Sequence, residues 1–276
     1  MIDLDRYFAR IGYHGPRTPT LDTLNQIVCA HVQAIPFENL DVLLGLPIDL
    51  ELGALQRKLI DARRGGYCFE QNSLLLAVLT SLGFEARPLS GRVRYQRPRD
   101  YTPARTHLFV RVELDTSWLV DVGAAVMSMA QAIRLDTSEP QPTPHEPRRL
   151  VREGNVIFHQ ARLGDDWHDV YELTLEEMLP IDREVGNWYT SAHPRSHFKE
   201  RLMVARALPE GRRISLQNRE LTLRERDGRA DRRLIGSPDE LLEVLEARFG
   251  LAFPAGTRFP CPALDWPDPT AAPEAR

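Results

Sequence analysis

The spacing of apolar positions over residues 1–85 predicts a helical bundle. Thr20 is placed to cap a helix that ends before Pro36. The apolar stripe of this helix consists of Leu21, Leu24, Ile27, Val28 and His31. Residues 68–82 are apolar almost all round, and Gly83 supplies a stop signal. We therefore expect residues 68–82 to form a central, buried helix.

From Phe84 onward the period changes from that of a helix to that of a strand. Alternating residues indicate an antiparallel sheet built from "GRVRY", "THLFVRVEL", "SWLVDVG", "VIFHQARL" and "DVYELTL". The stretch "RLDTSEPQPTPHEPRR" is rich in proline and polar residues, so we expect an exposed loop there. A third region begins near Asn187, with strand candidates "RLMVARAL", "RISLQN" and "ELTLRERDG". It continues into a helix that Ser237 caps and Gly250 ends.

Length and composition fit a soluble globular protein with more than one packed unit. The chain has 276 residues, of which 42% are apolar and 27% charged. Its net charge of −4 provides no global field to recruit nucleic acid or an anionic membrane, so we expect a small-molecule partner. The first residues do not form a secretory signal, and no run reaches the length of a membrane span. The three cysteines are too few for a disulfide framework, so a reducing cytoplasm is the expected location.

Cys68 lies where the central helix is expected to begin, after the glycines of "RRGGYCFEQN". Unsatisfied N–H groups and the positive end of the helix dipole favour a thiolate there, and the same N–H groups are placed to receive an oxyanion. Gly65 and Gly66 allow positive φ angles and the close approach of a substrate. The alternative is a buried structural cysteine beside an ordinary turn.

A nucleophilic thiol needs a base, and the chain has eight histidines. His31 continues an apolar stripe and is expected to be a satisfied core residue, and His145 lies in the proline-rich loop. His107 differs, because the aliphatic residues of "THLFVRVEL" occupy the other face of the strand. We therefore expect His107 to point away from the packed side.

Asp121 is an acid within the apolar strand "SWLVDVG", where burial without a partner would be costly. The even separation of His107 and Asp121 puts both side chains on one face of a hairpin. A turn centred on residue 114 makes them direct neighbours, whereas the polar residues 115–117 indicate a later turn that staggers them. The alternative is that Asp121 caps a turn before Gly123.

Six segments together resemble the arylamine N-acetyltransferase family: "PFENLDV", "RRGGYCFEQN", "THL", "VDVG", "NWYTSAHPRSHF" and "SPDELLEVLEARFG". The resemblance implies an α+β multidomain fold with a cysteine-protease-like catalytic core. Residues 1–85 would form a helical bundle that carries the nucleophile, and residues 86–186 an antiparallel β-barrel that carries the histidine and the aspartate. Residues 187–276 would form an α/β lid.

By position, the resemblance implies that Cys68 is the nucleophile, His107 its base and Asp121 the residue that orients the imidazole. Acetyl-CoA is then the co-substrate, an aromatic amine or hydrazine is the acceptor, an acetyl-cysteine is the intermediate, and no metal or permanently bound cofactor takes part. The implied coenzyme contacts are Thr106 and Ser196. The implied acceptor-pocket residues are Phe37, Tyr67, Phe69 and Phe198. Structural charges are implied for Glu38 and Arg64, and Asn72 would support the oxyanion or bond backbone.

The sequence departs from the family pattern just after "VDVG", where Phe and Gly usually follow and this chain has Ala124 and Ala125. Loss of an aromatic wall would weaken the grip on a flat arylamine and enlarge the pocket. An amide synthase that acts on a bulky thioester is therefore the nearest alternative. A cysteine peptidase or transglutaminase shares the triad, and a binding protein with a dormant site is the non-enzymatic alternative.

Overall fold

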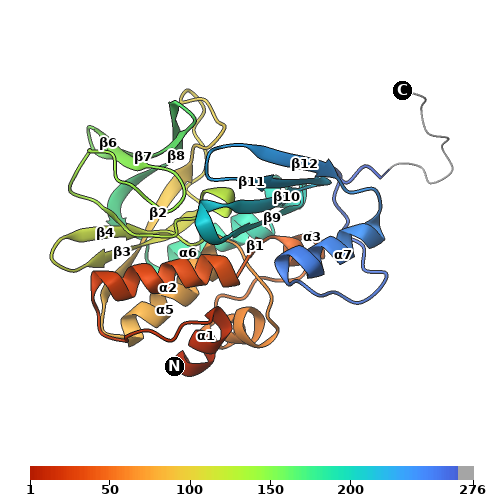
Figure 1. The fold of residues 1–276 in the computed structure, drawn as a ribbon, viewed down its shortest axis with the longest axis horizontal. Coiled ribbons are helices and arrows are strands. Elements are labelled where there is room, and N and C mark those ends of the chain that lie inside the picture. Colours follow the sequence, from red (N-terminus) through yellow and green to blue (C-terminus); the bar gives the residue numbers. More distant parts are fainter. Residues whose placement is uncertain (267–276) are drawn as a thin grey trace.

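Helices make up the first region of the computed structural model, which describes residues 1–266. They are α1 (Leu4–Ile11), α2 (Leu21–Ala34), α3 (Leu40–Leu43), α4 (Leu52–Leu55), the π-helix η1 (Gln56–Asp61) and α5 (Cys68–Ser81). One short strand, β1 (Phe37–Glu38), interrupts them. Thr20 caps α2 by accepting the Thr23 N–H, as its position predicts. Figure 1 shows α1, α2 and α5 together below the strands.

Helix α5 is the central buried element, as its apolar composition predicts. Leu74, Leu75, Val78 and Leu79 are fully buried in one core that also contains Val110 and Val112. This core includes apolar residues of α1, α2 and η1 as well, so α5 lies between the other helices and the first strands of the sheet. Burial on nearly all sides explains why residues 74–79 of the helix are all apolar.

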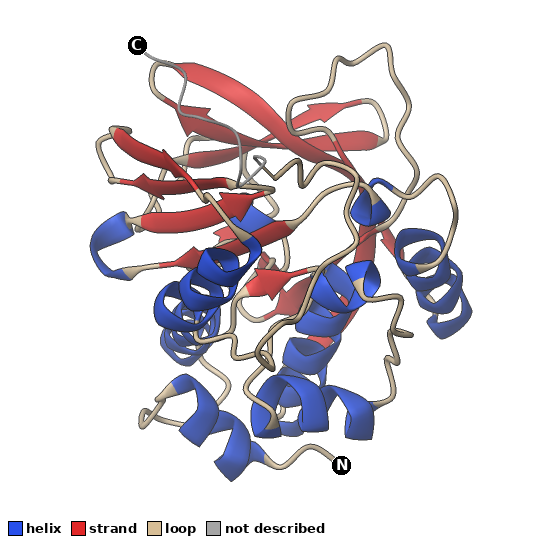
Figure 2. Ribbon diagram, turned by 90° about the vertical axis from the view of Figure 1, so that its right-hand side faces the viewer, coloured by secondary structure: helices blue, strands red, loops and turns tan. Residues whose placement is uncertain are grey.

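Seven antiparallel strands form a sheet that curls into a nearly closed barrel, in the order β5-β4-β3-β2-β8-β7-β6 (Figures 1 and 2). They are β2 (Glu85–Val93), β3 (His107–Glu113), β4 (Ser117–Val120), β5 (Ile133–Arg134), β6 (Arg148–Glu153), β7 (Val156–Leu163) and β8 (Asp166–Glu177). Strand β3 is buried on both faces, because Val110 packs toward the helices and Phe109 packs into the barrel. The expectation of one packed face for this strand was therefore wrong.

The proline-rich stretch before β6 is exposed only in part, which corrects the sequence-based expectation. His145 and Glu146 are 7% and 9% exposed, and Arg148 is 1% exposed. Glu146 forms ion pairs with Arg148 and with Arg213, and this neutralisation permits a carboxylate to be buried. Because Arg213 is remote in sequence, the pattern of the loop alone could not reveal this pairing.

The predicted boundary at residue 186 lies inside α6 (Pro180–Ser191), and the chain after this helix contributes four strands to a second sheet, of order β1-β9-β10-β11-β12. These strands are β9 (Met203–Ala207), β10 (Arg213–Gln217), β11 (Glu220–Arg224) and β12 (Ala230–Leu234). The last helix is α7 (Pro238–Phe249), and its apolar residues share a core with this sheet. Three 3-10 turns complete the described elements: η2 (Ala125–Met127), η3 (His197–Lys199) and η4 (Pro209–Gly211). The division at residues 85 and 186 stays a prediction, and β1 joins the first region to the second sheet through antiparallel pairing with β9.

Candidate active site

Cys68 is the first residue of α5, where the sequence places a nucleophile. Tyr67 caps the helix with an extended backbone, and its N–H donates to Glu70 Oε2 at 3.0 Å. The Cys68 side chain is 3% exposed, and Sγ lies 3.7 Å from the carbonyl oxygen of Thr106. The sulfur therefore lies at the positive end of a helix and directly beside the start of β3.

The two glycines before Cys68 let neighbouring backbone approach closely and do not form a left-handed turn. Neither Gly65 nor Gly66 has a positive φ, so that expectation was wrong, and Arg63 takes the left-handed conformation instead with a φ of 52°. A Cβ on Gly65 would lie 2.1 Å from the carbonyl oxygen of Pro36. The segment pairs with β1, because Glu38 N–H donates to the Gly66 carbonyl at 3.0 Å. Side chains here would push β1 away from the loop that leads to Cys68.

His107 and Asp121 form a buried pair across the β3–β4 hairpin. His107 Nε2 lies 2.6 Å from Asp121 Oδ2. The register joins Val110 to Val120, so the turn lies later than residue 114 and the two side chains are staggered on one face, as the polar residues 115–117 predict. The Gly123 N–H also donates to Asp121 Oδ1 at 2.9 Å, so Asp121 caps a turn as well as binding the imidazole.

The surroundings of His107 favour an imidazolium. Burial by itself lowers the pKa of His107, but the Asp121 carboxylate and then the Cys68 side chain raise it, to about 10. Both neighbours act through charge and through a hydrogen bond to the ring. Nε2 donates to Asp121, and the same ring interacts with the Cys68 side chain. The structure thus brings Cys68, His107 and Asp121 together in the order the sequence predicts.

The inward direction of His107 differs from the expectation that it would point away from the packed side. Its side chain is 3% exposed and lies against two aromatic rings in the barrel. The ring centroids of Phe109 and Tyr171 lie 5.7 and 5.0 Å from that of the imidazole. Tyr171 was not singled out from the sequence, because an aromatic residue in a strand carries no signal that separates it from ordinary core. It restricts the orientation of the imidazole by packing.

Asn72 and Gly123 join α5 to the two strands. Asn72 Nδ2 donates to the Leu108 carbonyl at 2.7 Å and to Asp121 Oδ1 at 3.0 Å, and its Oδ1 accepts the Val122 N–H. These bonds favour backbone and aspartate support, the second of its two expected roles. A Cβ on Gly123 would lie 2.5 Å from the Cα of Cys68. Only glycine permits this contact between helix and strand end.

The four predicted acceptor-pocket aromatics gather around Cys68. Phe37, Tyr67 and Phe69 are buried in one apolar cluster with Cys68, and the partly buried Phe198 packs against it. The centroid of the Tyr67 ring lies 5.9 Å from that of Phe69 and 5.4 Å from that of Phe198. Ala125 and Val126 of η2 border the same cluster. Of the two residues that depart from the family pattern, Ala125 therefore lies beside Cys68, whereas Ala124 packs against the barrel core.

The two predicted coenzyme contacts occupy different surroundings. Thr106 is partly exposed and places its carbonyl beside Cys68. Ser196 is 2% exposed, and its hydroxyl donates to the Thr190 carbonyl at 2.5 Å while it accepts the Phe198 N–H. Ser196 thus fixes the turn that carries Phe198. The coenzyme contact of each residue stays a prediction.

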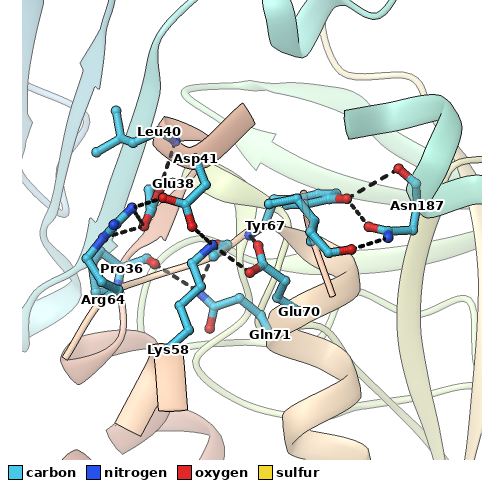
Figure 3. Close-up of polar contacts among 12 residues, drawn as sticks. Pro36, Glu38, Leu40, Asp41, Lys58, Arg64, Tyr67, Glu70, Gln71 and Asn187 are labelled. Atoms are coloured by element: carbon cyan, nitrogen blue, oxygen red, sulfur yellow. Dashed lines mark hydrogen bonds and ion pairs between the residues drawn. The ribbon is translucent and has the colours of Figure 1, made fainter. Parts of the chain in front are cut away.

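Glu38 and Arg64, for which the resemblance implies structural charges, pair with each other. Arg64 donates to Glu38 Oε1 through Nε and a terminal nitrogen, at 3.1 and 2.7 Å. Figure 3 shows that this pair belongs to a larger group of buried charges between β1, η1 and α5. The Tyr67 hydroxyl points the other way in the same view and donates to Asn187 of α6.

Residues 1–266 contain neither a membrane-spanning helix nor a cluster of metal ligands. No helix in this part of the chain combines the length and the apolar character that crossing a membrane requires. Within the same residues, no three His, Cys, Asp or Glu side chains meet as a metal site would need.

Comparison with known proteins gives consistent results. The N-acetyltransferase family model matches residues 20–257. The arylamine N-acetyltransferase of Mycolicibacterium smegmatis is 44% identical over 255 residues, which cover 91% of this chain and 92% of that protein. The arylamine N-acetyltransferase of Escherichia coli is 39% identical over 249 residues, with coverage of 90% and 88%. Among solved structures, Mycobacterium marinum arylamine N-acetyltransferase in complex with CoA has a TM-score of 0.87 at 41% identity and covers 90% of this chain and 93% of that chain.

Proposed function

Because the chain belongs to the arylamine N-acetyltransferase family, we propose that it transfers an acetyl group from acetyl-CoA to the nitrogen of an aromatic amine or hydrazine. The observation that carries the proposal is the geometry around Cys68. A buried thiol at a helix start faces an imidazole whose other nitrogen is held 2.6 Å from a carboxylate. This arrangement supplies an activated nucleophile, a proton carrier and a fixed orientation for the carrier.

In the first half-reaction, the Cys68 thiolate attacks the carbonyl carbon of the thioester, and a new carbon–sulfur bond forms. The bond to the sulfur of coenzyme A then breaks, and the His107 imidazolium gives its proton to that leaving group. Backbone N–H groups at the start of α5 are placed to stabilise the oxyanion between these steps. The product is an acetyl-cysteine and a neutral His107.

In the second half-reaction, the nitrogen of the acceptor attacks the acetyl carbon on Cys68. His107 takes the proton from that nitrogen, and the Cys68 thiolate leaves. The Asp121 carboxylate stabilises the imidazolium that is formed again. Coenzyme A departs before the acceptor reacts, so the kinetics are ping-pong.

Intact-protein mass spectrometry after incubation with acetyl-CoA tests the first half-reaction. We expect one added acetyl group on Cys68, which disappears when an arylamine is supplied. Cys68→Ser should fold and stay unmodified, because His107 cannot ionise a hydroxyl of much higher pKa. Folded wild-type protein that takes up no acetyl group would refute the proposal.

An amide synthase on the same scaffold is the second candidate, and the residues after "VDVG" favour it. Ala124 replaces a larger Phe and packs against the barrel core, and its neighbour Ala125 borders the Cys68 cluster, so loss of the aromatic ring leaves more room near the site for an acyl group or acceptor. The two candidates are separated by offering acetyl-CoA with arylamines and, separately, a bulky thioester. Reaction with only the bulky thioester would replace the first proposal by the second.

A further inference from the structure

Three buried carboxylates and two partly buried cations surround the backbone that leads into Cys68 (Figure 3). We call them the charge cluster: Glu38, Asp41, Lys58, Arg64 and Glu70. Lys58 Nζ lies 2.7 Å from Asp41 Oδ2 and 2.6 Å from Glu70 Oε1. Arg64 binds Glu38 at 2.7 Å and Asp41 at 2.8 Å. The cluster thus joins β1, α3, η1 and α5.

Glu70 receives fewer hydrogen bonds from cations than Glu38 does in the charge cluster. The cluster holds three carboxylates and two cations, and its side chains are between 0% and 18% exposed. Glu38 receives the Arg64 guanidinium and the Leu40 N–H at 2.7 Å, and Asp41 touches both cations. Glu38 and Glu70 each have one cationic partner, which each shares with Asp41, but Arg64 donates to Glu38 through two nitrogens and Lys58 donates to Glu70 through one. A buried excess of negative charge favours uptake of one proton, and Glu70 is where the balance is weakest.

Glu70 also has the most direct contact with the start of the catalytic helix. Its Oε2 accepts the Tyr67 N–H at 3.0 Å, one residue before Cys68. A Cβ on Gly66 would lie 2.7 Å from the same oxygen, so the carboxylate is packed against the chain before the nucleophile. Lys58 holds the other oxygen from the π-helix η1. The Lys58–Glu70 pair therefore ties the first turn of α5 to a separate helix.

We propose that Lys58 and Glu70 are positioning residues for Cys68, and that a proton on Glu70 loosens their ion pair and slows the reaction of the thiolate. The proposal rests on the proposed function, since it assigns these residues to the same nucleophile. Loosening the pair lets the first turn of α5 move relative to His107. A misplacement of about 1 Å in such a site costs on the order of a hundredfold in rate.

The electrostatics of Glu70 agree with this role. Burial raises the pKa of Glu70, Lys58 lowers it, Glu38 raises it again and the Tyr67 N–H lowers it, with a result of about 7. The groups that face it are Lys58 from η1, Glu38 from β1 and Tyr67 from the helix cap, with Asp41 and Arg64 behind them. Both protonation states of Glu70 are therefore populated near neutral pH.

The test measures the rate at which iodoacetamide alkylates Cys68 between about pH 5.5 and 8.5, which requires no acetyl-CoA. In the wild type we expect an inflection near the pKa of Glu70. Glu70→Gln should remove this inflection and lower the rate at about pH 8 by roughly tenfold, because an amide forms no ion pair with Lys58. Lys58→Met should move the inflection to higher pH. Lys58→Arg should restore the wild-type profile.

Arg57→Met is the matched control, since Arg57 is an exposed neighbour in the same π-helix. It should leave both rate and inflection unchanged. An inflection that persists in Glu70→Gln would overturn the proposal. So would variants that lose thermal stability but keep the wild-type pH profile, because that result means a purely structural role. If Lys58→Met fails to fold, the pH profiles of Glu70→Gln and Lys58→Arg still test the positioning role.

Acetylation by acetyl-CoA is measured on the same variants to separate the two proposals. If the wild type is alkylated with the expected profile but never acetylated, the proposed function fails and the positioning role stands. If the wild type is acetylated and Glu70→Gln shows an unchanged pH profile in both reactions, the positioning role fails and the function stands.

Discussion

At the scale of single residues, Asp121 holds its neighbours in the site through both carboxylate oxygens. Its fully buried carboxylate binds His107 on one oxygen and accepts from Asn72 and from the Gly123 N–H on the other. Two neutral donors and one imidazolium compensate for the loss of water around the charge. The negative charge of Asp121 is therefore both stabilised and aimed at His107.

Asp121→Asn should keep the size and shape of the side chain at residue 121 and remove its negative charge. Burial would then lower the pKa of His107 with less opposition, so we expect a value well below about 10. The rate of Cys68 acetylation should fall at least roughly a hundredfold, as loss of the orienting charge does in related triads. Imidazole titration followed by NMR and single-turnover kinetics measure the two effects. Asp136→Asn, at a surface pair with Arg134, should change neither. A His107 pKa that stays near 10 in Asp121→Asn would contradict the assignment.

Ala125 carries backbone strain that its neighbour does not. Its φ is 51°, in the left-handed region that favours glycine, whereas Ala124 has a φ of −91°. We expect Ala125→Gly to raise the free energy of unfolding by up to about 1 kcal/mol, because relief of strain exceeds the added entropy of the unfolded chain. Ala124→Gly should lower it by roughly 0.5–1 kcal/mol. Urea titration of both variants measures the difference, and two changes of the same sign would show that the strain is absent.

At the scale of elements, the active site depends on how closely the end of β4 approaches the start of α5. Gly123→Ala would place a methyl group 2.5 Å from the Cα of Cys68, and both elements are held by buried backbone. We expect a loss of about 1–3 kcal/mol in stability. The larger effect should be on acetylation, because the shift separates Cys68 from His107. Gly53→Ala is the control, since its new Cβ meets only the end of the Arg57 side chain at 3.3 Å. Equal activity of Gly123→Ala and the wild type would refute this account of the contact.

Elements with a strong apolar period were predictable from the sequence, and elements held by distant partners were not. "VIFHQARL" coincides with β7, and α5 begins at Cys68 as expected. In contrast, β12 is exposed at all five positions, so its polar sequence gives no strand period. Strand β1 has two residues and exists because β9, far along the chain, pairs with it. Such strands are specified by their neighbours and not by their own pattern.

The same distinction applies to the site. The separation of His107 and Asp121 is even, and side chains alternate between the two faces of a strand. The sequence therefore predicts correctly that both side chains lie on one face of the hairpin, without knowledge of the register. The roles of Lys58 and Glu70 were not predicted, because a Lys and a Glu 12 residues apart resemble ordinary surface charges. Their burial becomes visible only when η1, α3 and β1 converge on α5.

At the scale of the whole molecule, the third region binds the segment that precedes Cys68. Asn39 donates to the carbonyls of Phe198 and Arg201, both at 2.8 Å, and accepts the Met203 N–H at 2.9 Å. Together with the bond from Tyr67 to Asn187, these contacts tie residues on both sides of the charge cluster to α6, η3 and β9. The position of Cys68 therefore depends on residues from all parts of the described chain.

Buried histidines predict how the stability of the whole molecule depends on pH. Burial lowers the pKa values of His31, His145 and His197 to about 4, and that of His159 well below its ordinary value. A lowered pKa means that the unfolded chain binds more protons than the folded chain in this pH range. Stability is therefore lost as the pH falls from about 6.5 toward 4. Glu70 has the opposite effect on stability, because the folded chain binds one proton there more tightly than the unfolded chain does. Its raised pKa gives stability that is present at low pH and is lost as the pH rises toward 7.

The histidines outnumber Glu70, so we expect the free energy of unfolding to fall steeply below about pH 6.5, with His31 alone contributing on the order of 3 kcal/mol by pH 4. His107 affects stability at alkaline pH. Its raised pKa gives stability that is present below about pH 6.5 and is lost as the pH rises through about 10. Urea titrations at several pH values should therefore show a maximum near neutrality. His197→Asn should reduce the acid slope by about 1.4 kcal/mol per pH unit at most, since it removes one of the protons taken up on unfolding. A stability that is constant between about pH 4 and 6.5 would mean that these imidazoles are hydrated in the folded protein, contrary to the complete burial of His31.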